Sequence, residues 1–161
     1  MIDKIGLSLL TMFGIGHFKY APGTIASFVT CLIFFLLNNF LDIYVIFLLT
    51  LAIFFLSIIS INFAYKNFDS NDPQEIVIDE FIGQMLPLLA IPIYETLYPT
   101  HKIYYCIIVF VLFRFFDILK PFPINYIDEN TKGAFGIMFD DIIAGVFTII
   151  LFSISLFFLG G

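Results

Sequence analysis

Apolar residues in this chain form long runs separated by short polar stretches. We find five such runs, over residues 25–37, 43–64, 81–94, 103–116 and 137–159. None shows the apolar–polar alternation of a barrel strand, so the pattern predicts helices. Residues 1–24 predict a short amphipathic helix followed by a glycine-rich loop. We therefore expect an all-α bundle of about five apolar helices, forming one domain over residues 1–161.

The lengths of the runs indicate which helices can cross a membrane. Runs 43–64 and 137–159 are long enough to span about 30 Å of hydrocarbon at about 1.5 Å per residue. The other three runs are shorter and also suit buried or re-entrant helices, and Pro87 and Pro92 interrupt the third. The stretches 65–74 and 120–136 are polar, and we expect loops there. The pattern predicts a polytopic membrane bundle and leaves the number of true spans open.

Composition supports a bilayer as the surrounding solvent. The chain is 61% hydrophobic and 12% charged, against about 45–50% and about 25% in soluble domains. Its net charge of −6 disfavours nucleic acid as a partner, and no obligate protein partner is indicated. Cys31 and Cys106 lie within apolar runs and are expected to be small buried side chains. The first 24 residues lack a continuous apolar core before a cleavage site, so we expect no cleavable signal peptide.

The distribution of basic residues predicts the orientation in the membrane. If all five runs cross, one side of the bilayer carries most of the cations: Lys4, Lys19, Lys66, Lys120 and Lys132, with Arg114 at its edge. The opposite side carries only Lys102. Because loops rich in lysine and arginine stay in the cytoplasm, the polar motifs are expected to face it.

Five acids lie beside or inside the apolar runs. Asp79 and Glu80 immediately precede the third run, where they could cap a helix. Asp140 and Asp141 lie inside the start of the fifth run, followed one turn later by Ala144 and Gly145, which permit a close helix contact. Acids at such positions are costly unless they are neutralised, and they are therefore candidates for function.

Arg114, Asp117 and Lys120 follow one another at steps of three, which places them on one helical face before Pro121 ends the helix. They could form an interfacial ion pair with a snorkelling lysine. They could also supply one metal-binding carboxylate between two cations for phosphate, and Arg114 is the only arginine in the chain.

Together these residues predict a site for Mg²⁺ and phosphate. The five carboxylates, which we assign to both metal binding and catalysis, are oxygen ligands of the kind that hard cations prefer: Asp79, Glu80, Asp117, Asp140 and Asp141. Arg114 and Lys120 would bind the phosphate. Thr24 and Ser27, at the start of the first apolar helix, could add contacts at a helix N-terminus, although Thr24 could be only an N-cap and Ser27 only a packing residue.

Four ordered motifs give the chain a resemblance to a known family. They are Pro22-Gly23-Thr24-x-x-Ser27, Asp79-Glu80-Phe81-Ile82-Gly83, Phe113-Arg114-x-x-Asp117-x-x-Lys120-Pro121-x-Pro123 and Gly136-Ile-Met-x-Asp140-Asp141-Ile-x-Ala144-Gly145. This order resembles phosphatidylglycerophosphatase A, and Asp128 and Asn130 fall where that family has an Asp-x-Asn. Ala26 departs from the pattern, since a glycine is expected there.

The resemblance implies a Mg²⁺-dependent lipid phosphatase in the bacterial inner membrane. Its expected substrate is phosphatidylglycerol phosphate, and its expected products are phosphatidylglycerol and inorganic phosphate. The motifs of cysteine phosphatases, haloacid dehalogenases and phosphatidic acid phosphatases cannot be assembled from this chain. Attack by water, with a carboxylate as the base, is the favoured mechanism, and an aspartyl-phosphate intermediate stays open.

The alternative from another class is a small membrane transporter that uses the acids as a cation path. Such a path needs polar groups distributed through the bilayer, whereas these acids are expected to gather at one edge. A purely structural membrane subunit would leave the five acids unexplained.

Overall fold

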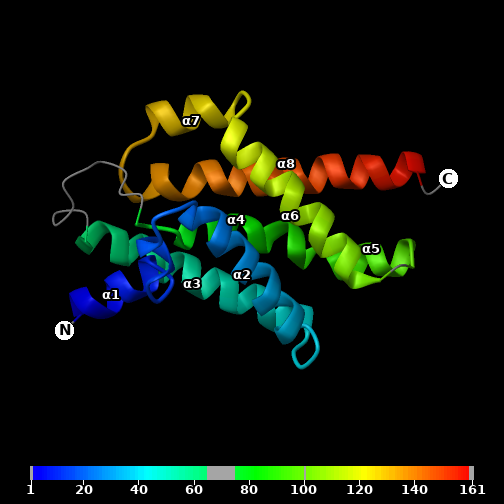
Figure 1. Ribbon diagram of the computed structural model, residues 1–161, viewed down its shortest axis with the longest axis horizontal. Helices are drawn as coiled ribbons and strands as arrows, with labels where there is room; N and C mark the ends of the chain where they lie inside the picture. Colours follow the sequence, from blue (N-terminus) through cyan, green and yellow to red (C-terminus); the bar gives the residue numbers. More distant parts are fainter. Residues whose placement is uncertain (1, 65–74, 100, 160–161) are drawn as a thin grey trace.

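The computed structural model describes residues 2–64, 75–99 and 101–159, and these residues form helices joined by turns and loops, with no strand among them. In chain order the elements are α1 (Ile2–Leu10), the 3-10 helix η1 (Ile15–His17), α2 (Pro22–Leu37), α3 (Ile43–Ala64), α4 (Ile78–Leu89), α5 (Ile91–Leu97), α6 (Lys102–Leu119), α7 (Ile124–Asn130) and α8 (Gly133–Leu159) (Figure 1). The predicted helical class is confirmed.

Helix α4 is the centre of the bundle. It packs against α8, α2, α6 and α3, and eight of its 12 residues are buried: Ile78, Phe81, Ile82, Gly83, Gln84, Met85, Pro87 and Leu88. At about 1.5 Å per residue it is only about 18 Å long. The third apolar run is therefore a short interior helix, followed after Ala90 by the separate helix α5.

Two glycines allow α4 and α8 to cross at very short range. A Cβ atom on Gly145 would lie 2.5 Å from the carbonyl oxygen of Gly83, and one on Gly83 would lie 2.6 Å from that of Asp141. Pro87 has no N–H to bond the carbonyl of Gly83 four residues earlier, so this carbonyl is free to face α8. The close contact expected near Gly145 is present, and its partner is Gly83.

The outer helices carry the apolar surface that the composition predicts. By length and composition, segments Ile43–Phe63 of α3 and Gly133–Phe158 of α8 can cross a membrane, and α3 exposes large side chains such as Phe47, Leu48 and Phe55. Helices α2 and α6, with 16 and 18 residues, are shorter. Two helices thus meet the requirement for a span, which leaves the expected number of about five unconfirmed.

One end of the bundle gathers the polar motifs. The N-termini of α2, α4 and α8 lie there with the C-terminus of α6 (Figure 1). The polar stretch 120–136 was wrongly expected to be a loop, because it contains α7 and the first turn of α8. Helix α7 is held to α6 and α8 by an apolar cluster that sequence periodicity could not reveal: Phe113, Phe116, Ile124 and Ala144. The predicted loop 65–74 lies outside the described residues.

The glycine crossing predicts a difference between two glycine variants. Gly145→Ala should lower the free energy of unfolding by about 1–3 kcal/mol, because α4 and α8 must separate to admit the methyl group. Gly6→Ala is the control. Its Cβ would meet Ser60 at 3.5 Å, an ordinary contact, so it should be neutral or stabilising by up to about 1 kcal/mol. Denaturant unfolding in detergent measures both, and equal stability of the two variants would contradict the tight crossing.

Candidate phosphate and cation site

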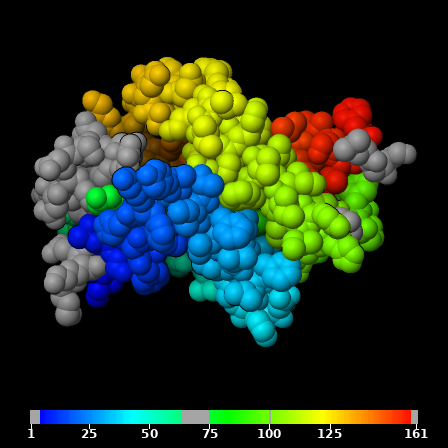
Figure 2. All heavy atoms as spheres, viewed as in Figure 1, coloured from blue at the N-terminus to red at the C-terminus, as the bar shows by residue number. Residues whose placement is uncertain are grey.

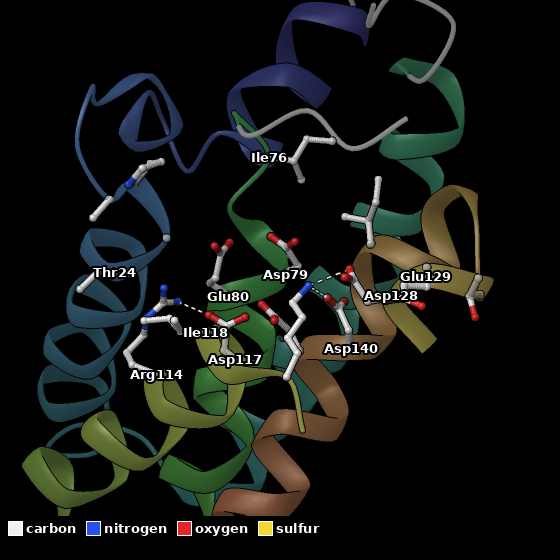
Figure 3. A pocket seen from close by; sticks show the side chains of 18 of the residues that line it. Thr24, Ile76, Asp79, Glu80, Arg114, Asp117, Ile118, Asp128, Glu129 and Asp140 are labelled. Atoms are coloured by element: carbon white, nitrogen blue, oxygen red, sulfur yellow. Dashed lines mark hydrogen bonds and ion pairs between the residues drawn. The ribbon is translucent and has the colours of Figure 1, made fainter. Parts of the chain in front are cut away.

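A polar cavity of about 580 Å³ opens at this end of the bundle. Its walls come from the start of α2, the start of α4, the end of α6, α7 and the start of α8. Eight of the nine residues predicted from the sequence line it: Thr24, Asp79, Glu80, Arg114, Asp117, Lys120, Asp140 and Asp141 (Figure 3). In Figure 2 the surface is recessed between α2 (blue) and the α6–α7 region (yellow to orange). Residues up to 117 positions apart in sequence thus share one cavity.

Three carboxylates form the centre of the site. One oxygen from each of Asp79, Glu80 and Asp141 lies within 4.8 Å of the others. Each of these residues, and Asp140 too, has a buried carboxylate oxygen without a hydrogen-bond partner among the described residues. Buried carboxylate oxygens are normally paired. Oxygens left unpaired at this spacing are what a bound hard cation would satisfy, so the donor set fits Mg²⁺.

The glycine crossing brings these acids together. Asp79 precedes Gly83 by one turn of α4, and Asp141 precedes Gly145 by one turn of α8. When the two glycines meet, the acids one turn earlier are therefore brought to the same end of the crossing. Glu80 is held from the other side, because its carboxylate lies against the backbone of α2 at Gly23. A Cβ atom there would meet Glu80 Oε1 at 1.9 Å.

Arg114 forms the cationic wall beside the acids. Its Nη1 atom makes an ion pair with Asp117 at 2.5 Å and donates a hydrogen bond to Ser27 Oγ at 3.4 Å. Both side chains of the ion pair are largely buried. Ser27, in turn, donates to the carbonyl of Gly23 at 2.9 Å. Ser27 does not line the cavity; it lies behind Arg114, on the inner face of α2.

Lys120 supplies the second cation. Its Nζ atom lies 2.7 Å from both Asp128 Oδ1 and Asp140 Oδ2 (Figure 3). Burial by itself would lower the pKa of Lys120, but the hydrogen bonds that Lys120 donates to Asp128 and Asp140 outweigh burial and raise the pKa. An ammonium has three N–H groups, so a third can reach a ligand. Lys120 is therefore held charged at the cavity wall.

The sequence interpretation missed two residues. Asp128 on α7 was noted as a family match but not as part of the site, and it shares Lys120 with Asp140. Only the position of α7 reveals this role. Gln84 lies one turn beyond Glu80 on α4, fully buried, and neither of its amide atoms has a hydrogen-bond partner among the described residues. A lone glutamine in an apolar run gave no usable signal.

Without a cation, the surroundings of the acids on α4 shift their pKa values upward, toward the neutral forms. Burial raises the pKa of Asp79 well above its usual range, and the neighbouring charge of Glu80 raises it further. Burial also raises the pKa of Glu80. A hydrogen bond with Asp79 and the charge of Arg114 oppose this rise, while Asp117 adds to it. A divalent cation would reverse this balance, because it favours the charged form of every carboxylate around it.

Comparison with known proteins gives one family. The family model described as Phosphatidylglycerophosphatase A matches residues 8–156. A Bacteroides thetaiotaomicron protein, assigned provisionally as a phosphatidylinositol-3-phosphatase, is 35% identical over 153 residues, which are 93% of this chain and 92% of that protein.

Two further relatives carry the family name. Phosphatidylglycerophosphatase A of Haemophilus influenzae is 35% identical over 139 residues, 86% of this chain and 81% of the relative. Phosphatidylglycerophosphatase A of Escherichia coli is 34% identical over 134 residues, which are 83% of this chain and 73% of the relative. No solved structure matches the chain significantly.

The repulsion among the acids predicts how one variant changes stability. In the unfolded chain Asp79 ionises near pH 4, since its usual pKa is 3.8, whereas in the folded protein its pKa is raised. Between these two pKa values the folded protein holds a proton on Asp79 that the unfolded chain has released. The cation-free protein should therefore lose stability as pH rises through this window. Asp79→Asn should lessen this loss and raise the melting temperature at pH 7.

The control for this prediction is Asp42→Asn, which changes an exposed acid at the far end of α2 and α3. Thermal unfolding in chelator, followed from pH 4 to pH 8, measures both variants. A parent protein whose stability does not fall with pH, or an Asp79→Asn variant no more stable than Asp42→Asn, would contradict the repulsion.

Proposed function

This chain belongs to the phosphatidylglycerophosphatase A family and is a phosphatase, and from that premise we propose that it hydrolyses phosphatidylglycerol phosphate to phosphatidylglycerol and phosphate in phospholipid synthesis. The observation that carries the proposal is the cavity. In it lie three carboxylates, each with an oxygen that has no hydrogen-bond partner among the described residues, beside two cations held by ion pairs. A divalent cation, an arginine and a lysine are the groups that recognise a phosphate monoester.

We assign the acids two different tasks. Asp79, Glu80 and Asp141 would hold Mg²⁺, since their oxygens converge within 4.8 Å. Asp117 orients Arg114, and Asp140 orients Lys120. When bound, Mg²⁺ would neutralise the acids and polarise the phosphoryl group.

The chain's own groups bind and orient the phosphate. Arg114 and Lys120 present charged N–H groups to its oxygens, and each is held in place by carboxylates. The first turn of α2 at Gly23 and Thr24 faces the same cavity, and N–H groups at a helix N-terminus favour an anion. With the phosphate fixed in this way, a carboxylate of the wall can accept the proton of an attacking water.

The protein would sit in the bacterial cytoplasmic membrane with this cavity on the cytoplasmic face. Supporting this, α3 and α8 are long and apolar enough to span, and Lys19, Lys120 and Lys132 belong to the lysine-rich end. A transporter path is less favoured, because the described acids of the site gather at one end of the bundle.

The function itself is tested with purified protein in detergent micelles. Phosphate release from phosphatidylglycerol phosphate should require Mg²⁺ and should stop in chelator. Asp141→Asn should abolish most of the activity while the protein still folds. Because one relative is assigned to phosphatidylinositol-3-phosphate, that lipid is the comparison substrate. A higher kcat/KM for phosphatidylinositol-3-phosphate would show that this lipid, and not phosphatidylglycerol phosphate, is the preferred substrate. Full activity in chelator would show that the reaction does not need Mg²⁺.

Arg114→Lys tests the phosphate-binding cation. The variant keeps the charge but loses the planar arrangement of N–H donors that holds Asp117, Ser27 and phosphate together. We expect kcat/KM to fall roughly 10–1,000-fold, as when one transition-state donor is removed. Lys102→Arg, at the start of α6 and far from the cavity, is the matched control. Activity of Arg114→Lys equal to that of the parent would show that Arg114 only forms a structural ion pair and does not bind phosphate.

Topology can be measured with single cysteines in sealed vesicles. Asn39 lies in the turn between α2 and α3, and Asn130 lies at the end of α7, at opposite ends of the bundle. With Cys31 and Cys106 replaced by alanine, Asn130→Cys should react with an impermeant reagent only from the cytoplasmic side, and Asn39→Cys only from the other. Labelling of both from one side would contradict this orientation.

A further inference from the structure

The polar cavity has one edge that leads to an apolar surface. Ile118 on α6 and Thr24 on α2 both line the cavity (Figure 3), yet the side chain of Ile118 is 66% exposed. Much of the remaining wall is polar, including Asp128, Glu129 and Lys132 on the α7 side. A ligand with a charged head and an apolar remainder can leave this cavity most favourably past Ile118.

On α6, this surface continues along one helical face. Ile107, Val111, Arg114 and Ile118 follow at steps of four, three and four, so they lie in one row. The three apolar members of the row are more than half exposed. The row therefore runs from the cavity toward the start of α6, and Arg114 is the point where it meets the polar site.

A second row on α2 adjoins the first. It starts at Thr24 and continues through Phe28, Leu32 and Phe35, and these last three side chains are exposed. The two helices meet where Arg114 bonds Ser27 and where Phe28 packs edge to face on Phe110, with ring centroids 6.2 Å apart. The apolar residues of the two rows, here called the α2–α6 stripe, are Phe28, Leu32, Phe35, Ile107, Val111 and Ile118.

We propose that the acyl chains of the lipid substrate lie along the α2–α6 stripe while its phosphate occupies the polar cavity. The proposal rests on the proposed function and adds the path by which the substrate reaches the site. In phosphatidylglycerol phosphate the head-group glycerol, a phosphodiester and the backbone glycerol link the terminal phosphate to the acyl chains. The head group can therefore fill the polar cavity while the chains leave at its apolar edge, past Ile118. The stripe begins at the cavity edge, next to Arg114. The substrate thus enters sideways from the bilayer, between the start of α2 and the end of α6.

An apolar cavity of about 560 Å³ between α1, α2, α3 and α4 is the competing place for the chains. It shares no lining residue with the polar cavity. Its α4 residues, Ile78, Phe81 and Met85, lie on a different face of the helix from Asp79. Packing of α2 on α4, where Gly23 meets Glu80, separates the two cavities. A chain bound there would have to pass over the N-terminus of α2.

Chain-length dependence distinguishes the two routes. The measurement is the ratio of kcat/KM for a long-chain to that for a short-chain phosphatidylglycerol phosphate in detergent micelles. The double variant Phe28→Ala/Val111→Ala should lower this ratio roughly 3–30-fold, because it removes apolar contact that only long chains make. Phe13→Ala, an exposed aromatic of the apolar cavity, should leave the ratio unchanged. A fall with Phe13→Ala alone, or no chain-length preference in the parent, would overturn the proposal.

Photolabelling gives a readout that does not require turnover or a folded variant. The parent protein is illuminated with a phosphatidylglycerol phosphate that carries a diazirine in its acyl chain. Labelling at Phe28 and Val111 should be competed by unlabelled long-chain phosphatidylglycerol phosphate and not by phosphatidylcholine. Competed labelling without any hydrolysis would preserve the lipid path and reject the proposed function. Hydrolysis with competed labelling only at the apolar cavity, or with none, would reject the path and preserve the function.

Discussion

The rest of this structure depends on one electrostatic constraint, the gathering of like charges at the end of an apolar bundle. Asp79, Glu80 and Asp141 converge at the wall of the polar cavity, where they are partly or fully buried, and one oxygen of each lacks a partner among the described residues. Such an arrangement costs stability, since low dielectric magnifies the repulsion. Proteins retain strain of this kind at sites of function. A bound divalent cation would offset this repulsion and would favour a phosphate beside it.

The backbone meets this constraint through small residues. Gly83 and Gly145 let α4 and α8 approach within the distance that a Cβ atom would occupy, and Gly23 does the same for α2 against Glu80. Pro87 contributes by leaving the carbonyl of Gly83 unbonded within α4. The contact between Gly83 and Gly145 positions the acids one turn earlier on each helix, and the contact at Gly23 positions Glu80 directly. The glycines of these motifs thus serve the geometry of the charges, although none carries a charge.

The cations complete the arrangement by joining elements that are distant in sequence. Arg114 links α6 to α2 through Ser27, and Lys120 links the end of α6 to α7 and α8 through Asp128 and Asp140. A phosphate bound between them would touch groups from several helices at once. The exposed apolar rows begin at the same point, so a polar and an apolar surface of the protein meet at Arg114.

The sequence alone determined the helical class, the bounds of α3 at residues 43–64, eight of the polar residues around the cavity and, through four ordered motifs, the family. These follow from local properties, namely hydrophobic runs, residue chemistry and spacing. It did not predict α7, the break between α4 and α5, the partner of Gly145 or the sharing of Lys120 by Asp128 and Asp140. Only the tertiary structure decided these, because each depends on which helices pack against one another. Helical periodicity predicts which face of a helix is buried, but not which helix packs against that face.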